Sequence, residues 1–276
     1  MITQRLAMIS TNKPTCPDVP SRSPPNHKQK SPKRCQPVSN RDKLPFDEEE
    51  ALILAFREQI RYERQIEDAK VRMVSQHDFN LMDAYQMLDR TSKGWVTGPE
   101  IIEALYDYGL QPHKEDVYLF VRHYDRDCDG RLLFSDFADA FCPLDQTSAS
   151  VLNCREAANL HRGVPKTQYF MQETRDMFIR LIKQHFQVEE SCELIRKRLA
   201  RRSHFSSHQA YSHCDREQNG YLSAEDFRRV LLENQVFVTD AELKALVARY
   251  DTNADGRVSY SEFVQELAPK SQSKLF

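Results

Sequence analysis

Four stretches of twelve residues begin with aspartate and end with aspartate or glutamate, and three of them carry oxygen-bearing side chains at positions one, three and five. They begin at residues 89, 125, 215 and 251, so the two members of each pair start 36 residues apart. Hard divalent cations such as Ca²⁺ bind about six to eight oxygens from carboxylates, amides and backbone carbonyls, and alternating side chains can turn such oxygens toward one centre. We name these stretches loops 1 to 4 in chain order and expect metal ions at those that keep the required oxygens.

Loop 4 matches the calcium-loop pattern D-x-[DN]-x-[DN]-G-x5-E at every specified position. Positions one, three and five turn side-chain oxygens inward, and a glycine at position six permits the sharp turn. Position seven gives a backbone carbonyl, and the glutamate at position twelve binds through both oxygens. These residues are Asp251, Asn253, Asp255, Gly256, Arg257 and Glu262.

Loops 2 and 3 offer similar oxygens but end in aspartate. Aspartate is one methylene shorter than glutamate, so its reach for a two-oxygen contact is poorer and Mg²⁺ competes better. Loop 2 also has Leu133 at position nine, where water replaces a side-chain ligand. The predicted ligands are Asp125, Asp127, Asp129, Asp136 and the carbonyl of Arg131 in loop 2, and Asp215, Glu217, Asn219, Asp226 and the carbonyl of Tyr221 in loop 3.

Loop 1 keeps Asp89 and Glu100 at its two ends but has Thr91 at position three and Lys93 at position five. An ammonium group at the place of a ligand repels a cation. We therefore predict that loop 1 is a structural partner of loop 2 and holds no metal. Affinity for calcium should fall from loop 4, in the range of about 10⁻⁷–10⁻⁵ M, through loop 3 to loop 2.

The sequence repeats itself after 126 residues, the difference between loop starts 89 and 215. The register holds without a gap from residue 63 to residue 143, about 80 residues, and so predicts two copies of one unit. Identical pairs include Glu63 and Glu189, Tyr85 and Tyr211, Gly94 and Gly220, Tyr124 and Tyr250, and Phe137 and Phe263.

Apolar residues at helical spacing flank the loops, and position eight is apolar in all four: Val96, Leu132, Leu222 and Val258. With these features the chain resembles EF-hand proteins of the calmodulin, troponin C and centrin superfamily over residues 76–147 (module 1) and 202–273 (module 2). The resemblance implies a helix on each side of every loop, short strands that pair the hands at position eight, and Ca²⁺ as the ion, with Mg²⁺ possible at the loops that end in aspartate. The hands would span about 76–111, 112–147, 202–237 and 238–273.

The elements that position these modules are two long helices rich in Arg, Glu and Lys, expected over residues 47–76 and 168–201. The expected fold is all-α, with two lobes that are each preceded by one long charged helix. We predict domains over 46–146 and 167–270, a linker over 147–166 with a short helix from Ser148 to about His161, and a final tail over 271–276. The charged helices either face solvent with ion pairs four residues apart or dock along a filament.

Residues 1–45 differ in composition from the rest of the chain. They hold eight of the thirteen prolines and nine Lys or Arg against two acids. Such a segment buries too little apolar surface to offset its chain entropy. We predict a disordered basic tail, which acts either as a solvated spacer or as an arm for an acidic partner such as a cytoskeletal surface.

The charge balance of 39 Lys and Arg against 41 Asp and Glu gives a formal net charge of −2 and argues against a nucleic-acid-binding protein. No apolar run reaches the ~18–20 residues of a membrane span. The N-terminus lacks the apolar core of a signal peptide, and seven cysteines without CxxC pairs suit reduced thiols. These features predict a cytoplasmic protein.

Other chemistry finds little support. His204, His208 and Cys214 are zinc-ligand types, but no second pair has ligand spacing. No P-loop, Gly-x-Ser-x-Gly or HExxH motif occurs, so we expect no enzyme.

Three functions stay open. The first is a regulatory calcium sensor that reorients its helices and exposes an apolar groove, with Met73, Met82 and Met87 as candidate lining, to a helix of a dedicated protein partner. The second is a cytoskeletal or axonemal scaffold whose lobes are permanent joints, because the chain also resembles EF-hand proteins of ciliary and cortical cytoskeletons in protists; the cilium or cytoskeleton would then be its location. The third, by analogy alone, is a regulatory subunit of a phosphatase or kinase. The oligomeric state stays open.

Overall fold

The computed structural model describes residues 44–157 and 163–271. The predicted tail over 1–45 lies outside the described residues except for Leu44 and Pro45, as does the final tail except for Ser271. Leu44 is buried among the apolar residues of module 2, so order begins slightly earlier than we predicted. The prediction of disorder for the rest of the tail stays a prediction.

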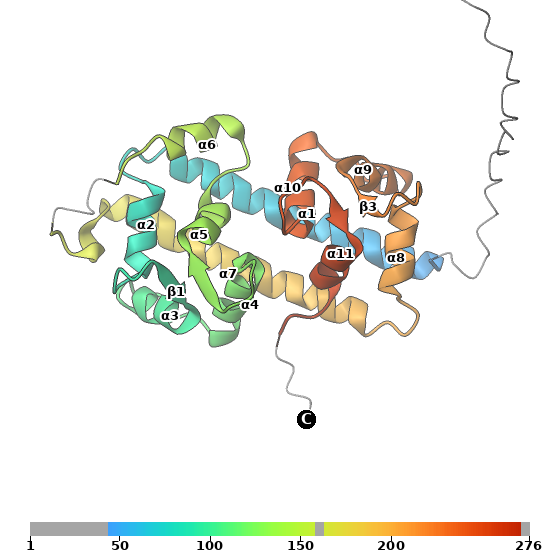
Figure 1. Cartoon of the computed structure of the whole chain (residues 1–276), viewed down its shortest axis with the longest axis horizontal. Helices are drawn as coiled ribbons and strands as arrows, with labels where there is room; N and C mark the ends of the chain where they lie inside the picture. The colour runs from blue at the N-terminus through green and yellow to red at the C-terminus, as the bar shows by residue number, and fades with distance from the viewer. Residues whose placement is uncertain (1–43, 158–162, 272–276) are drawn as a thin grey trace, which may run out of the picture. The chain divides into compact units, whose positions relative to one another are not determined.

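Two long helices run beside the modules (Figure 1). Helix α1 (Phe46–Val74) and helix α7 (Gln172–Ala200) each have 29 residues, and neither contains Pro or Gly. Acidic residues in the first turn of α1, Asp47, Glu48 and Glu49, complement the positive end of the helix dipole. Helix α7 begins four residues later than expected, after the short 3-10 turn η1 (Lys166–Gln168). Asp78 holds this start, because its carboxylate accepts hydrogen bonds from the Met171 amide at 2.7 Å and the Thr174 hydroxyl at 2.6 Å.

Each module has the same order of elements. Module 1 contains α2 (Leu81–Leu88), β1 (Trp95–Thr97), α3 (Gly98–Tyr106), α4 (Lys114–Tyr124), β2 (Arg131–Leu133) and α5 (Phe134–Phe141). Module 2 contains α8 (Ser207–Cys214), β3 (Tyr221–Leu222), α9 (Ala224–Glu233), α10 (Asp240–Tyr250), β4 (Val258–Ser259) and α11 (Tyr260–Leu267).

The position-eight residues form the predicted short sheets. Val96 pairs with Leu132 in module 1, and Leu222 pairs with Val258 in module 2, both in antiparallel strands. All four side chains are buried. The all-α fold with two lobes and the pairing of hands at position eight are confirmed.

The linker differs from its prediction. Its helix α6 (Gln146–Asn153) begins where the Asp145 carboxylate accepts the Ser148 amide at 2.8 Å, and it ends eight residues before His161. After α6 the Arg155 guanidinium donates hydrogen bonds to the carbonyls of Val74, Gln76 and Phe79 at 2.6–2.8 Å. These carbonyls lie at and just after the end of α1, so Arg155 satisfies acceptors that a helix end leaves open.

The apolar cores show how the long helices hold the modules. The core of module 1 contains Phe178, Ile182 and Phe186 from the first half of α7. The core of module 2 contains Leu52, Phe56 and Ile60 from the first half of α1. Each residue of the first set lies 126 positions after its counterpart in the second, so equivalent segments fill equivalent places. The last turns of the helices stay with their own repeats, through Met73 in module 1 and Leu199 in module 2.

Each long helix therefore inserts its first half into the module of the other repeat. Two equivalent hydrogen bonds mark this exchange: the Tyr250 hydroxyl donates to Gln59 of α1 at 2.8 Å, and the Tyr124 hydroxyl pairs with His185 of α7 at 3.1 Å. The predicted domains over 46–146 and 167–270 imply that each repeat supplies its own core, and the cores instead combine both repeats. The domain boundaries at 146 and 167 stay predictions.

Candidate metal centres

All four loops adopt one backbone conformation. The residue at position four has a left-handed φ of 53–61° in Ser92, Cys128, Gln218 and Ala254, and the glycine at position six has a φ of 79–88°. In each loop the amide of that glycine donates to the aspartate at position one, at 2.8–2.9 Å. Residues other than glycine rarely adopt a positive φ, so this repeated geometry comes from the loop and not from chance.

Hydrogen bonds within loop 4 orient its predicted ligands. Amide N–H groups donate to Asp251 at 3.2 Å, to Asn253 at 2.9 Å and to Asp255 at 2.8 Å, which orients the three side chains. Glu262 is buried, and its two oxygens accept hydrogen bonds from Thr252 at 2.9 Å and from the Ser259 hydroxyl at 2.7 Å. Burial alone raises the pKa of Glu262, but these hydrogen bonds outweigh burial and lower it. The carboxylate is thus ionised and oriented at the loop, as a calcium ligand needs to be.

Loop 2 brings three carboxylates together. One oxygen each of Asp125, Asp127 and Asp129 lies within 4.8 Å of the others, an arrangement that fits a cation. Burial, followed by a side-chain contact with Asp127, raises the pKa of Asp125 against the hydrogen bonds from backbone amides, and burial also raises the pKa of Asp136. A divalent cation would offset this crowding of negative charge. Leu133 is exposed and supplies no side-chain oxygen at position nine, as predicted.

Loop 3 contains a competitor that the sequence analysis missed. The Arg229 guanidinium forms an ion pair with the terminal ligand Asp226 at 2.9 Å. Hydrogen bonds from Ser223, and after them this ion pair, lower the pKa of Asp226 although burial raises it. The Asn219 side chain accepts the Tyr221 amide at 3.1 Å, and Glu217 is exposed. Because a guanidinium binds the carboxylate intended for the ion, this contact opposes binding at loop 3.

In loop 1 the cation that pairs with the terminal carboxylate is the ammonium group of Lys93, a residue of the loop itself. Lys93 forms an ion pair with Glu100, and its Nζ lies 3.3 Å from the centroid of the Trp95 ring. Partial burial raises the pKa of Glu100, but hydrogen bonds from Lys93 and Thr97 lower it to about 2. Lys93 therefore occupies the carboxylate that would bind the ion, which agrees with a structural loop.

A second lysine fastens loop 1 to the linker. The Lys166 ammonium donates to Ser92 at 2.8 Å and to Gln86 at 3.1 Å, and it also donates to the Asp89 carbonyl. Lys166 lies 77 residues after Asp89, so no local pattern indicated this contact.

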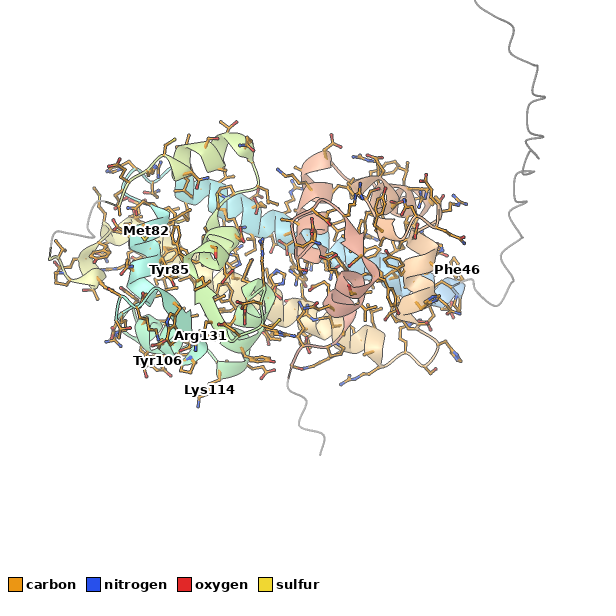
Figure 2. All side chains as sticks on the ribbon, in the orientation of Figure 1. Phe46, Met82, Tyr85, Tyr106, Lys114 and Arg131 are labelled. Carbon is orange, nitrogen blue, oxygen red and sulfur yellow. The ribbon has the colours of Figure 1, made fainter. Side chains whose placement is uncertain are left out.

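The other candidates do not form sites. His204 and His208 are exposed while Cys214 is fully buried, so the three do not combine into a zinc site. Met73 and Met87 are buried in the core of module 1, and Met82 on α2 is half-buried (Figure 2). The methionines proposed as the lining of a groove therefore lie against the chain's own helices.

Comparison with known proteins agrees with the geometry. A family model described as an EF-hand domain pair matches residues 78–142 and again residues 206–267. These ranges coincide with the modules that hold the four loops. The chain is an EF-hand protein, and it binds calcium.

Similar proteins cover the EF-hand chain to different extents. Troponin C of Tyrophagus putrescentiae is 22% identical over 187 residues, which cover 68% of this chain and 90% of that protein. Human centrin-3 is 20% identical over 184 residues, which cover 67% and 78%. Human EF-hand calcium-binding domain-containing protein 6 is 32% identical over 121 residues, 42% of this chain, and the chain spans only 8% of that relative.

These similarities place the chain among the calmodulin-like EF-hand proteins. Across residues 44–157 and 163–271, no helix combines the length and the apolar character that crossing a membrane requires.

Proposed function

We propose that this EF-hand protein regulates one dedicated protein partner through calcium-dependent movement of its modules against α1 and α7. The observation that supports the proposal is that apolar segments of the chain's own helices fill both modules. Phe56 of α1 contacts the rings of Phe227 and Tyr250 in module 2 at centroid distances of 5.4 and 6.1 Å. Phe178 of α7 contacts Phe137 and Phe141 of module 1 in the same way.

Calcium binding to sensor EF-hands changes the angle between their helices from about 130–140° to about 90–100°. Such a change in module 2 would displace α9 and α10 from Phe56 and weaken the hold on α1. A partner helix can then bind either the opened module or the released helix. Because Met73 and Met87 are buried, a Met-rich surface for many partners is not supported, and a dedicated partner fits better.

A scaffold function is the second candidate, and the exchange of helices between repeats favours it. When two repeats share both cores, the modules are held at fixed places along the helices whether or not ions are bound. In this case the protein would be a permanent joint in a cytoskeletal or axonemal assembly. We infer for both candidates a non-enzymatic protein of the cytoplasm that binds a partner helix or a cytoskeletal element.

Hydrogen exchange of the full chain, with calcium and with chelator, separates the two candidates. The sensor predicts that calcium increases exchange in the first halves of α1 and α7, around Phe56 and Ile182, because the modules release them. The scaffold predicts unchanged or stronger protection at the same amides. The matched variants are Glu262→Gln, which should abolish the response of α1, and Glu100→Gln, which should leave it intact. Unchanged exchange in α1 and α7, despite calcium binding measured by calorimetry, would contradict the sensor.

A further inference from the structure

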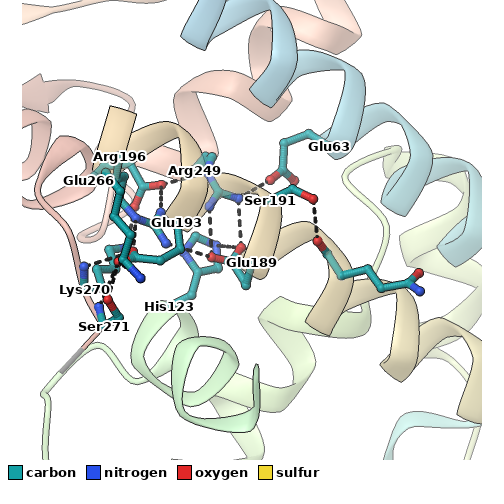
Figure 3. A network of polar contacts seen from close by, with 12 residues as sticks. Glu63, His123, Glu189, Ser191, Glu193, Arg196, Arg249, Glu266, Lys270 and Ser271 are labelled. Carbon is teal, nitrogen blue, oxygen red and sulfur yellow. Dashed lines mark hydrogen bonds and ion pairs between the residues drawn. The ribbon is translucent and has the colours of Figure 1, made fainter. Parts of the chain in front are cut away.

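A cluster of buried charges lies outside the four loops, where α1, α7, α10 and α11 meet (Figure 3). Two arginines form its centre, and the side chains of Arg196 and Arg249 are both 0% exposed. Four carboxylates surround the arginines, and each is almost fully buried or lies at the edge of the cluster. They are Glu63, Glu189, Glu193 and Glu266.

Arg249 contacts three of these carboxylates, each on a different helix. Its Nε donates to Glu266 of α11 at 2.8 Å. Its two terminal nitrogens donate to Glu63 of α1 at 2.5 Å and to Glu189 of α7 at 3.0 Å. Arg249 itself belongs to α10, so one guanidinium joins both helices of the fourth hand to both long helices.

Arg249 and Glu266 lie on the two helices that flank loop 4, so their contact bears on ion binding at this loop. Arg249 lies two residues before Asp251, on the helix that leads into loop 4. Glu266 lies four residues after Glu262, on the helix that leaves the loop. A change in the angle between α10 and α11 therefore has to lengthen or break the contact between Arg249 and Glu266.

We propose that Arg249 and Glu266 form a latch that holds the fourth hand closed and couples ion binding at loop 4 to α1 and α7. The inference rests on the proposed function, because it requires that loop 4 binds calcium and that binding reorients its helices. In the closed hand each buried charge has an opposite partner. Glu266 also pairs with Arg196 at 3.1 Å and with Lys270, so loss of Arg249 removes one of its three partners. The buried charge of Glu266 is then less well compensated, and this destabilises the state that buries it.

Hand 2 has no such latch. The positions equivalent to Arg249 and Glu266, 126 residues earlier, are His123 and Ala140. Ala140 has no charge, and His123 lies 3.9 Å from Glu189. Loop 2 can therefore bind an ion without breaking a buried arginine–glutamate contact between its two helices, whereas ion binding at loop 4 works against the latch.

Calorimetric titration of the full chain with calcium tests the latch. Asp125→Asn and Asp215→Asn form the common background, so that loop 4 keeps the only complete set of ligands. The variants are Arg249→Met and Glu266→Gln. Lys244→Met is the matched control, because it removes a positive charge from an exposed position on the same helix α10.

Glu266→Gln gives the sharper result, because simple electrostatics and the latch predict opposite signs. Loss of a negative charge near loop 4 by itself weakens calcium binding. If the latch opposes binding, both Glu266→Gln and Arg249→Met strengthen it, by roughly 5–150-fold as is usual for coupled sites. Lys244→Met should change the affinity by less than either variant.

Unchanged or weaker calcium binding in Glu266→Gln overturns the latch, even if Arg249→Met proves too unstable to titrate. Absence of calcium binding at loop 4 in the background protein is a different result, and it contradicts the proposed function itself. Binding in the background with equal affinity in Glu266→Gln contradicts only the latch.

Discussion

Replacement of Phe56 by alanine tests the exchange of long helices between the repeats. Phe56 belongs to the first repeat by sequence, but its ring is fully buried in module 2. Truncation of a buried phenylalanine to alanine costs about 3–5 kcal/mol, from lost burial and from the cavity that remains. The lost ring contacts with Phe227 and Tyr250 place the effect toward the upper end of this range.

Hydrogen exchange at the two short sheets shows which module loses stability when Phe56 is truncated. The strand pairs Val96–Leu132 and Leu222–Val258 report on modules 1 and 2. A loss of about 3–5 kcal/mol corresponds to exchange that is roughly 10²–10⁴ times faster. Phe56→Ala should therefore accelerate exchange at Leu222 and Val258 by this factor, with a smaller effect at Val96 and Leu132.

The matched variant is Ile182→Ala, at the equivalent position 126 residues later. Ile182 is buried in module 1, so the pattern should reverse, with a loss of about 2–5 kcal/mol. If Phe56→Ala loosened module 1 more than module 2, the helices would pack within their own repeats and our reasoning would be refuted.

Three further predictions concern the loops and the buried histidine. Glu262→Gln removes one negative charge from loop 4 and should weaken calcium binding measured by calorimetry, whereas Glu100→Gln should leave it unchanged because Lys93 already holds that carboxylate. Lys93→Met should raise the pKa of Glu100 from about 2 toward its ordinary value near 4.5, as followed by NMR of the carboxyl carbon, and an unmoved pKa would show that the ion pair is unimportant. Burial holds the pKa of His185 well below its ordinary value of 6.5, so the histidine is neutral in the fold and charged only in acid. Its contribution to stability is therefore complete above pH 6.5 and falls as the pH drops below it; urea midpoints should show this slope, and His185→Gln, which copies the equivalent Gln59, should reduce it.

Much of the candidate site could be predicted because its determinants are local. The position of Asp251, Gly256 and Glu262 in twelve consecutive residues specifies both the turn and the oxygens. The same is true of Lys93, whose place at position five predicted repulsion of a metal ion, whereas its ion pair with Glu100 was found only in the structure. Local spacing also predicted the pairing of Val96 with Leu132 and the positions of the loops.

Contacts between distant residues could not be predicted in this way. The nearby pair of Arg229 and Asp226, one helical turn apart, was also missed, because such pairs are common on solvent-facing helices and their spacing does not indicate competition with an ion. Lys166 reaches loop 1 and Arg249 reaches Glu63 over separations of 77 and 186 residues. A charged residue in a sequence shows its charge but not its partner.

The sequence by itself determined that this chain has two related helical modules, four loops of unequal ligand quality and two long charged helices. These properties depend on spacing, and spacing is preserved when the chain folds. Only the tertiary structure decided which helix fills which module. The segments around Phe56 and Ile182 have the same apolar pattern, so either could pack in either module by pattern alone. The buried partners of Arg249, Glu63 of α1 and Glu189 of α7, distinguish the exchanged arrangement, because hydrophobic burial is not directional, whereas a buried charge needs its partner at a fixed distance.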